Sequence, residues 1–488
     1  MREIKLNFAI SSFWFIAGRG SSNLIGFLIF ALLARFLGPR DFGLVAFAAL
    51  FIDITRPLAL LGFPQAMIQR PTWDDAVASN AFWANVVLSL VLAVLLGGVF
   101  APFMAAVYNP HIGWVIPALA FTLLIDAARA LHEAKLQREF SYKSLAKRTV
   151  FASIFGGIVG VTLAYCGFGI WALVASRLVI SIAQTAMIWW TVRWVPEFTF
   201  SFAVIRPLLA FGLHVSSAAI LSQINVRASE FIIGLFLGPA SLGFYKIGTR
   251  AVGTMNDVVI EPMKATTLSA LSRVNGRGSV AQGYLRITKA CSILSFPVYF
   301  GAATIAQDFV VLCFGPQWKT SGDVMAMLAL LGGAATLNNF AMPALTAVGQ
   351  TRLANLSNLV SLLTSTVIAL VLVRYGIAMV AMGFALRGYL TIPFVLWMLR
   401  RGLGLSPIQV LRGLAAPFLS ATVMAVSIMI LSVEYLQGLH PLARMSIMVS
   451  TGVVLYAVCL LVVGRAFVSE LRAEVMPIFR RLKKQFKR

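Results

Sequence analysis

Three pairs of opposite charges lie inside long apolar runs of the sequence, and the members of each pair are three residues apart. The pairs are Asp53 with Arg56, Asp126 with Arg129, and Arg227 with Glu230. This spacing puts both side chains on one face of a helix, so each pair can neutralise itself. We predict that these pairs fix helix packing or, together with Asp257, couple transport to an ion.

Other cations in the apolar runs have no acid within one helical turn. They are Arg19, Arg177, Lys246, Arg250 and Arg387. A charge at bilayer depth costs roughly 2.5–3.5 kcal/mol, so it faces an interior rather than lipid. An interior with excess cation attracts an anion, and an arginine can hold a phosphate through two hydrogen bonds. We predict a cationic, substrate-binding cavity lined by Arg19, Arg56, Arg227, Lys246 and Arg250.

The sequence offers no comparable set of residues for catalysis. It contains no phosphate-binding loop of the GxxxxGK[ST] kind, no nucleophile elbow, and no paired carboxylates on a loop. The four cysteines and four histidines are scattered without ligand spacing, so we expect no metal and no cofactor. The pattern favours a transporter over an enzyme.

Composition places the chain in the membrane. Hydrophobic residues make up 59% of it and charged residues 12%, whereas soluble domains have roughly 25% charged residues. The mean hydropathy is +0.88. Taking about 20 residues as one crossing, we predict an all-α polytopic membrane protein. Its fourteen expected spans lie near 8–33, 42–63, 80–106, 113–131, 149–167, 169–191, 207–234, 241–263, 288–313, 323–348, 355–373, 377–399, 413–433 and 445–464.

The distribution of lysine and arginine predicts the orientation. With the N-terminus in the cytoplasm, 27 of the 40 basic residues fall in cytoplasmic segments and five in segments on the opposite side. The net charge of +23 therefore reflects topology and not nucleic-acid binding. We expect both termini in the cytoplasm and the basic tail on anionic lipid headgroups. The longest cytoplasmic connections, near 132–148 and 264–287, are basic and amphipathic, which favours interfacial helices.

A short motif occurs twice, 200 residues apart. Phe36–Gly43 reads FLGPRDFG and Phe236–Gly243 reads FLGPASLG, and each predicts a turn between two spans. Six spans separate the copies, so the halves share one orientation, as parallel repeats do. We predict an N-terminal six-helix bundle (1–200), a second bundle that repeats it (201–405), two further helices (406–466) and a basic tail (467–488).

Several segments resemble bacterial polysaccharide flippases of the Wzx type, in the multidrug/oligosaccharidyl-lipid/polysaccharide exporter superfamily. They are ARFLGPRDFGL (34–44), GFPQAMIQR (62–70), GIWALV (169–174) and EFIIGLFLGPASLGFY (230–245), with Leu271–Arg273 downstream. The resemblance covers residues 1–400 and is closest to the branch that exports exopolysaccharide units. One departure is Leu235, which stands where the family often has an arginine. Arg227, one turn before Glu230, is the residue that would replace it.

The resemblance implies a substrate, a mechanism and a location. The substrate would be an undecaprenyl-diphosphate-linked oligosaccharide, moved from the cytoplasmic to the periplasmic leaflet of the inner membrane by alternating access. A polysaccharide polymerase and glycosyltransferases would be partners. Proton or sodium coupling stays open. Two alternatives are a cation-coupled multidrug exporter of the same superfamily, which would need an acidic lumen, and a membrane polysaccharide polymerase, which would need a large periplasmic loop.

The charge count predicts that both copies of the repeated turn face the periplasm. A cysteine placed at Gly38 or at Gly238 should therefore react with a membrane-impermeant thiol reagent added to the periplasmic side of intact cells. Labelling of either position only after the cytoplasm is opened would contradict the predicted topology.

Overall fold

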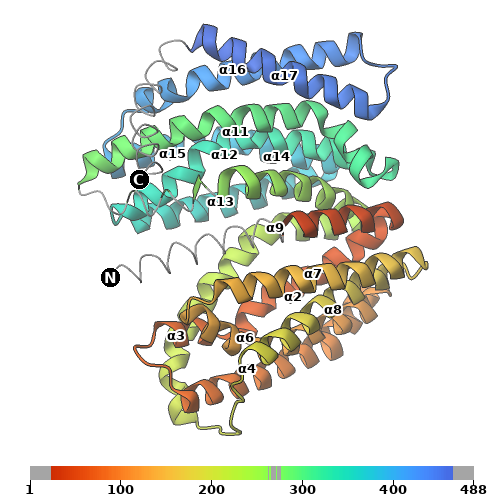
Figure 1. Ribbon diagram of the computed structural model, residues 1–488, viewed down its shortest axis with the longest axis vertical. Coiled ribbons are helices and arrows are strands. Elements are labelled where there is room, and N and C mark those ends of the chain that lie inside the picture. Colours follow the sequence, from red (N-terminus) through yellow and green to blue (C-terminus); the bar gives the residue numbers. More distant parts are fainter. Residues whose placement is uncertain (1–22, 262, 265–266, 268–270, 272–275, 465–488) are drawn as a thin grey trace, which may run out of the picture. The chain divides into compact units, whose positions relative to one another are not determined.

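The chain is helical throughout the part that the structure describes. The computed structural model describes residues 23–464 apart from 262, 265–266, 268–270 and 272–275. These residues form helices and connections without a strand (Figure 1). The predicted all-α fold is therefore confirmed.

The first of two compact units ends at Lys246. Within it α4 packs on α6, α6 on α8, α7 on α8, and α2 on α6. An apolar core that includes Phe63, Met67 and Leu131 lies among α3, α4 and α6. The elements of this unit are Asn23–Phe36, α2 (Pro39–Leu60), α3 (Phe63–Gln69), α4 (Asp75–Val94), the π-helical η1 (Leu95–Phe100), α5 (Ala101–Val107), α6 (Ile112–Arg138), α7 (Tyr142–Tyr165), α8 (Ile170–Thr191) and most of α9 (Phe202–Met255).

The second unit begins at Ile247. In it α11 packs against α12, α16 and α17, and α12 packs against α14. Its elements after α9 are the π-helical η2 (Asn256–Ile260), α11 (Arg277–Phe314), η3 (Pro316–Trp318), α12 (Lys319–Ala347), α13 (Thr351–Leu372), η4 (Val373–Tyr375), α14 (Ile377–Leu390), α15 (Ile392–Leu403), α16 (Pro407–Glu434) and α17 (Pro441–Val463).

Local sequence signals explain several helix starts. The Asp74 carboxylate caps α4 by accepting hydrogen bonds from the backbone N–H groups of Ala76 (2.9 Å) and Val77 (3.2 Å). The start of α16 is a capping box between Ser406 and Gln409, with Pro407 at the first helical position. These caps satisfy N–H groups that would otherwise lack partners at a helix end.

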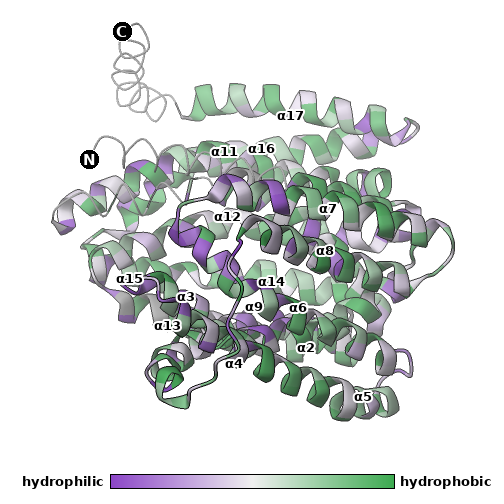
Figure 2. Ribbon diagram, turned by 60° about the horizontal axis from the view of Figure 1, so that its bottom comes forward, coloured by the Kyte–Doolittle hydropathy of each residue, from purple (hydrophilic) through white to green (hydrophobic). Residues whose placement is uncertain are grey.

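The described residues contain twelve helices long and apolar enough to cross a membrane. One of them, α9, is two helices joined at Gly238, where the backbone is not helical (φ 80°, ψ 178°). Counting α9 twice gives thirteen of the fourteen expected spans, and Asn23–Phe36 lies at the end of the remaining one. Figure 2 shows that α4, α5 and α17 are mostly hydrophobic. Exposed side chains such as Val94, Val99 and Phe103 are suited to face lipid.

The two long connections differ from their prediction as interfacial helices. Residues 132–148 belong mainly to the ends of α6 and α7, which meet at a tight turn where Phe140 has a positive φ of 56°. In the second connection, residues 277–287 are the first turns of α11. Where they are described, both segments are continuous with helices long and apolar enough to cross a membrane.

The two copies of the repeated turn pack on each other within the first unit. A Cβ atom added to Gly43 would lie 1.6 Å from the carbonyl oxygen of Pro239. A Cβ atom added to Gly243 would lie 2.1 Å from the carbonyl oxygen of Pro39. The last glycine of each copy thus lies against the proline of the other. Glycine at both positions allows two backbones to approach more closely than side chains would permit.

The two turns differ in backbone conformation although their sequences match. Gly38 has φ −81° and lies in open space, whereas Gly238 has φ +80°. A cysteine at Gly38 is therefore the less strained of the two labelling positions. The predicted division of the chain at residues 200, 405 and 466 stays a prediction.

We expect Gly43→Ala to destabilise the folded protein because the added methyl group has no room beside Pro239. Overpacking of this kind typically costs about 1–3 kcal/mol. The measurement is the midpoint of thermal unfolding of detergent-purified protein. Gly38→Ala is the matched control, since nothing lies within 4 Å of the added atom. Equal midpoints for the two variants would contradict the reciprocal contact.

Candidate functional site

Nine charged side chains of the first unit form a continuous series of alternating sign, which we call the charge chain. Its eight links have N···O distances between 2.7 and 3.8 Å. It joins α7, α6, α2 and α9. The members, in order, are Arg148, Glu133, Arg129, Asp126, Arg56, Asp53, Arg227, Glu230 and Lys246.

Asp126 is the centre of the charge chain. One of its carboxylate oxygens lies 2.8 Å from Nε of Arg56, and the other lies 2.9 Å from an Nη of Arg129. The hydroxyl of Ser181 donates a hydrogen bond of 3.0 Å to the same carboxylate. Its side chain is only 5% exposed. Several donors thus replace the water that this buried carboxylate has lost.

The α9 end of the charge chain crosses the kink at Gly238. Arg227 lies 3.0 Å from Asp53 and 3.0 Å from Glu230. Glu230 is also 2.7 Å from the ammonium group of Lys246, beyond the kink. Glu230 therefore connects the two halves of α9 through their charges. The sequence did not predict this pairing, because it assigned Lys246 no acid within one turn.

The α7 end of the charge chain is formed by Arg148 and Glu133. An Nη atom of Arg148 lies 3.3 Å from the carboxylate of Glu133, which is 3.8 Å from Arg129. Arg148 is only 5% exposed. Arg148 falls in a segment expected to connect two spans, so its place in the charge chain was not predicted from the sequence. The spacing of four between Arg129 and Glu133 was the available signal, since it places both on one helix face.

Helix α8 brings a further cation to the charge chain. Two α8 side chains hydrogen-bond to members of the charge chain: Ser181 donates to Asp126, and Gln184 accepts from Arg129. Arg177 lies one turn before Ser181 on the same face and within electrostatic reach of Asp53, Arg56, Arg227 and Glu230. The residue is accessible to solvent, although its guanidinium lies deep among protein atoms. Arg177 forms no hydrogen bond or ion pair with any residue that the structure describes.

The charge balance of this cluster is positive. The charge chain has five cations and four acids, and Arg177 adds one cation. Each of the four acids already contacts two cations. The six cations therefore exceed the acids by two positive charges. The acids hold the cations in place, and Arg177 is the member whose donors remain available to a ligand.

The structure brings together some of the predicted site residues and not others. The three pairs expected from spacing are present, at 3.5, 2.9 and 3.0 Å. Arg19 lies outside the described residues. Arg250 and Asp257 belong to the second unit, where they attract each other. Arg387 binds Ser361 and Ser365 and so ties α14 to α13.

No metal-binding group of three or more His, Cys, Asp or Glu side chains occurs among the described residues. The buried acids of the charge chain instead face arginine and lysine. The chemistry of the cluster is therefore that of anion attraction and exchangeable ion pairs.

Comparison with known proteins agrees with this chemistry. The family described as "Polysaccharide biosynthesis protein" matches residues 32–323. The chain belongs to this family. This confirms the relationship expected from the sequence motifs. The predicted transporter agrees with the name of a relative that is a transport protein.

Three curated relatives are transport or biosynthesis proteins of bacterial polysaccharides. The succinoglycan biosynthesis transport protein ExoT of Rhizobium meliloti (strain 1021) is 23% identical over 69% of this chain and 68% of its own length. The teichuronic acid biosynthesis protein TuaB of Bacillus subtilis (strain 168) is 25% identical over 60% and 62%. The lipopolysaccharide biosynthesis protein WzxC of Escherichia coli (strain K12) is 22% identical over 63% of each chain. The matches to the second and third thus span less than two thirds of those proteins.

Solved structures show the same fold. The lipid II flippase MurJ, in an inward closed conformation, aligns with a TM-score of 0.73 at 12% identity, covering 94% of this chain and 99% of its own. An inward-facing multidrug resistance transporter of the MATE family aligns with a TM-score of 0.57 at 15% identity, covering 83% and 95%. The expected polytopic helical fold is confirmed.

We expect Asp126→Asn to destabilise the protein strongly, since it leaves Arg56 and Arg129 facing a neutral group in a buried position. Removing one partner of a buried ion pair costs about 3–5 kcal/mol. Thermal unfolding in detergent and the amount of protein in the membrane measure the effect.

The matched control is Asp75→Asn. Asp75 lies 3.6 Å from Lys135, and its side chain is 61% exposed. Loss of an exposed pair should cost less than about 1 kcal/mol. Equal effects of the two substitutions would show that the charge chain does not stabilise the fold.

Proposed function

We propose that this protein flips a lipid-linked oligosaccharide across the bacterial inner membrane during polysaccharide export. The carrier would be undecaprenyl diphosphate, and the direction would be from the cytoplasmic to the periplasmic leaflet. Family membership, the names of the curated relatives and the shared fold support this proposal. Alternating access is the mechanism that fits a fold of this superfamily.

The observation that carries the proposal is the position of Arg177 beside the charge chain. A diphosphate that joins a lipid to a sugar bears one negative charge on each phosphate. The cluster offers a surplus of two positive charges, and the guanidinium of Arg177 can bind a phosphate through two parallel hydrogen bonds. We propose that Arg177 makes the first contact with the diphosphate.

The paired cations would then share the ligand. Arg227 and Lys246 both contact Glu230. A phosphate that approaches them competes with this carboxylate, and loss of the carboxylate's charge would weaken its hold on both cations. This exchange is a physical route by which binding could be coupled to protons; Asp53 and Asp126 are further candidates. The predicted roles of Arg19, Arg250 and Asp257 in the same process remain proposals.

Location and partners follow from the proposal. Placing both termini in the cytoplasm follows from the distribution of lysine and arginine. Glycosyltransferases would supply the lipid-linked unit, and a polysaccharide polymerase would consume it. A multidrug exporter of the same superfamily is less suited to this cluster, because expelling cations requires an excess of acid in the lumen. Here the described cluster has the opposite balance.

We expect Arg177→Gln to lower transport by roughly 10–100-fold, the loss that follows from removing a charged hydrogen bond worth about 1.5–3 kcal/mol. Transport is measured as the movement of a fluorescent lipid-diphosphate-linked oligosaccharide across proteoliposomes. Arg177→Lys should retain part of the activity, since it keeps the charge but loses the bidentate geometry.

Arg193→Gln is the matched control. Arg193 follows the end of the same helix, α8, and is exposed, but it lies outside the charge chain. The Arg193→Gln protein should transport the substrate at the normal rate. Unchanged transport by a folded Arg177→Gln protein would refute the role of Arg177.

A further inference from the structure

The connection between α8 and α9 runs across one end of the first unit without forming a helix. We call its residues, 192–201, the strap. Two of its side chains, Val192 and Trp194, are buried in the apolar core that includes Phe63 and Met67. The topology predicted from the distribution of lysine and arginine assigns the end of α8 and the start of α9 to the cytoplasmic side. The strap thus lies at the level where two expected spans meet that side.

Side chains of α4 and α6 hold the strap by its backbone. The hydroxyl oxygen of Ser79 accepts a hydrogen bond of 3.1 Å from the backbone N–H of Glu197. The indole N–H of Trp83 donates one of 2.9 Å to the carbonyl oxygen of the same residue. On α6, Nε2 of His132 donates to the carbonyl oxygen of Trp194 at 3.0 Å. These side chains pair with backbone groups that have no helix of their own to pair with.

Asn80 holds the end of the strap that leads into α9. Its side-chain oxygen accepts a hydrogen bond from the backbone N–H of Ser201, and its side-chain nitrogen donates to the hydroxyl of Thr199 at 3.3 Å. Asn80 is only 4% exposed. A non-helical backbone is costly at membrane depth unless protein groups satisfy its hydrogen bonds. The contacts with α4 and α6 therefore suit the strap to a position beside lipid.

The outer surface of the strap and of the helix ends beside it is rich in aromatic side chains. Phe198 and Phe200, on the strap, are 86% and 63% exposed. Trp190, near the end of α8, is 84% exposed, and Phe202, at the start of α9, is 63% exposed. Large exposed apolar side chains gathered in this way mark an interaction surface. Aromatic rings in particular are enriched at the level of lipid headgroups.

The aromatic surface of the strap continues the side of α4 that is suited to face lipid. The ring of Phe198 packs edge-on against that of Trp83, with ring centroids 4.8 Å apart. Trp83 begins a stripe that continues with the exposed residues Val87, Leu90 and Val94, at the spacing of one helix face. The stripe belongs to a helix long and apolar enough to cross a membrane. The bilayer is therefore the surface that would meet both the stripe and Phe198.

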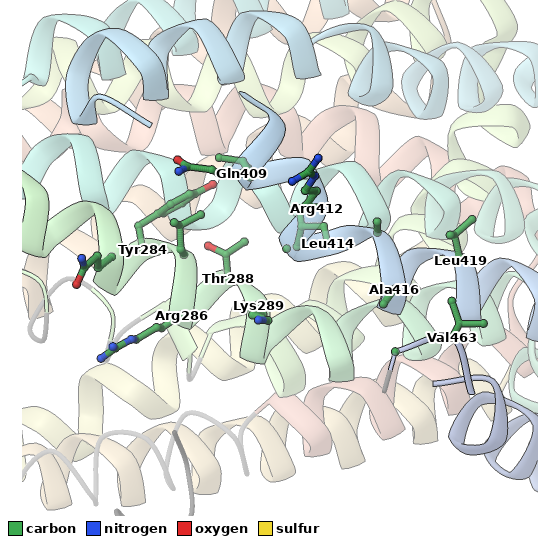
Figure 3. A pocket seen from close by; sticks show the side chains of 16 residues that line it. Tyr284, Arg286, Thr288, Lys289, Gln409, Arg412, Leu414, Ala416, Leu419 and Val463 are labelled. Carbon is green, nitrogen blue, oxygen red and sulfur yellow. The ribbon is translucent and has the colours of Figure 1, made fainter. Parts of the chain in front are cut away.

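Side chains at the corresponding helix ends of the second unit are arranged differently. A cavity of about 680 Å³ lies there between the starts of α11 and α16 and the end of α17 (Figure 3). Figure 3 shows that Arg286 and Arg412 point apart, so these two cations do not converge on one ligand. The one aromatic residue that lines the cavity, Tyr284, is buried. Exposed aromatic rings thus distinguish the strap from this cavity.

We propose that the strap anchors the first unit in the cytoplasmic leaflet, with Phe198 and Phe200 inserted between the headgroups and the acyl chains. Trp190 and Phe202 extend this anchor along the ends of α8 and α9. Asn80 is a positioning residue, because it holds the strap at the depth where the rings reach lipid. The partner is the lipid surface, since the aromatic surface is continuous with the stripe on α4. The anchor includes no member of the charge chain and does not depend on the proposed function.

The test is the depth of a nitroxide label at position 198, measured by electron paramagnetic resonance on the full-length protein in proteoliposomes of phosphatidylethanolamine and phosphatidylglycerol. The labelled variant is Phe198→Cys, in a protein whose four native cysteines are replaced by alanine. The label should be more accessible to oxygen, which dissolves among acyl chains, than to a water-soluble nickel chelate.

The matched control is a label introduced by Glu139→Cys. Glu139 is exposed at the turn between α6 and α7, beyond the end of the expected span at 113–131 and on the same side of the membrane. This label should be more accessible to the nickel chelate than to oxygen. If Phe198→Cys does not fold, Phe200→Cys gives the same measurement, because Phe200 is also exposed.

Asn80→Leu tests the support of the strap. Leucine is close to asparagine in size but can form neither hydrogen bond, so the label at position 198 should become more mobile and less accessible to oxygen. A label introduced by Val94→Cys should keep its depth in the same variant, which distinguishes loosening of the strap from unfolding of α4.

Three results would overturn the proposal. Greater accessibility to the nickel chelate than to oxygen at position 198 would show that the strap faces water. Low accessibility to both reagents would show that protein, such as a second copy of this chain, covers it. An unchanged label at position 198 in the Asn80→Leu variant would show that Asn80 does not position the anchor.

Discussion

The first unit depends on one electrostatic constraint, which is that a charge removed from water must meet an opposite charge. The charge chain satisfies this constraint by alternation, so that each acid lies between two cations. Because its members come from α2, α6, α7 and α9, the requirement for pairing also fixes how these helices pack. A substitution at one ion pair therefore alters the packing of more than one helix.

The depth of the charge chain determines how it can bind a ligand. Seven of its nine members lie within the expected spans, and each of its cations contacts at least one acid. Such cations bind a ligand mainly by exchanging partners.

The sequence predicts features that depend on one helix alone. The spans, the pairs three residues apart and the repeated turn follow from hydropathy and spacing, and the structure shows them. The ion-pair partners that come from other helices could not be predicted in this way. Arg177 and Lys246 seemed isolated because the acids near them come from α2 or from the far side of the Gly238 kink. Glu133 and Arg148 were missed because α6 and α7 extend beyond the apolar runs that marked their spans.

The reciprocal contact of Gly43 with Pro239 and of Gly243 with Pro39 has an evolutionary consequence. After a duplication, two copies of a segment usually diverge because each adapts to its own surroundings. Here each copy is the surroundings of the other. A larger side chain in either copy would displace the backbone of its counterpart, so neither can change alone. Mutual restraint of this kind keeps the two motifs alike at the glycine and proline positions that touch.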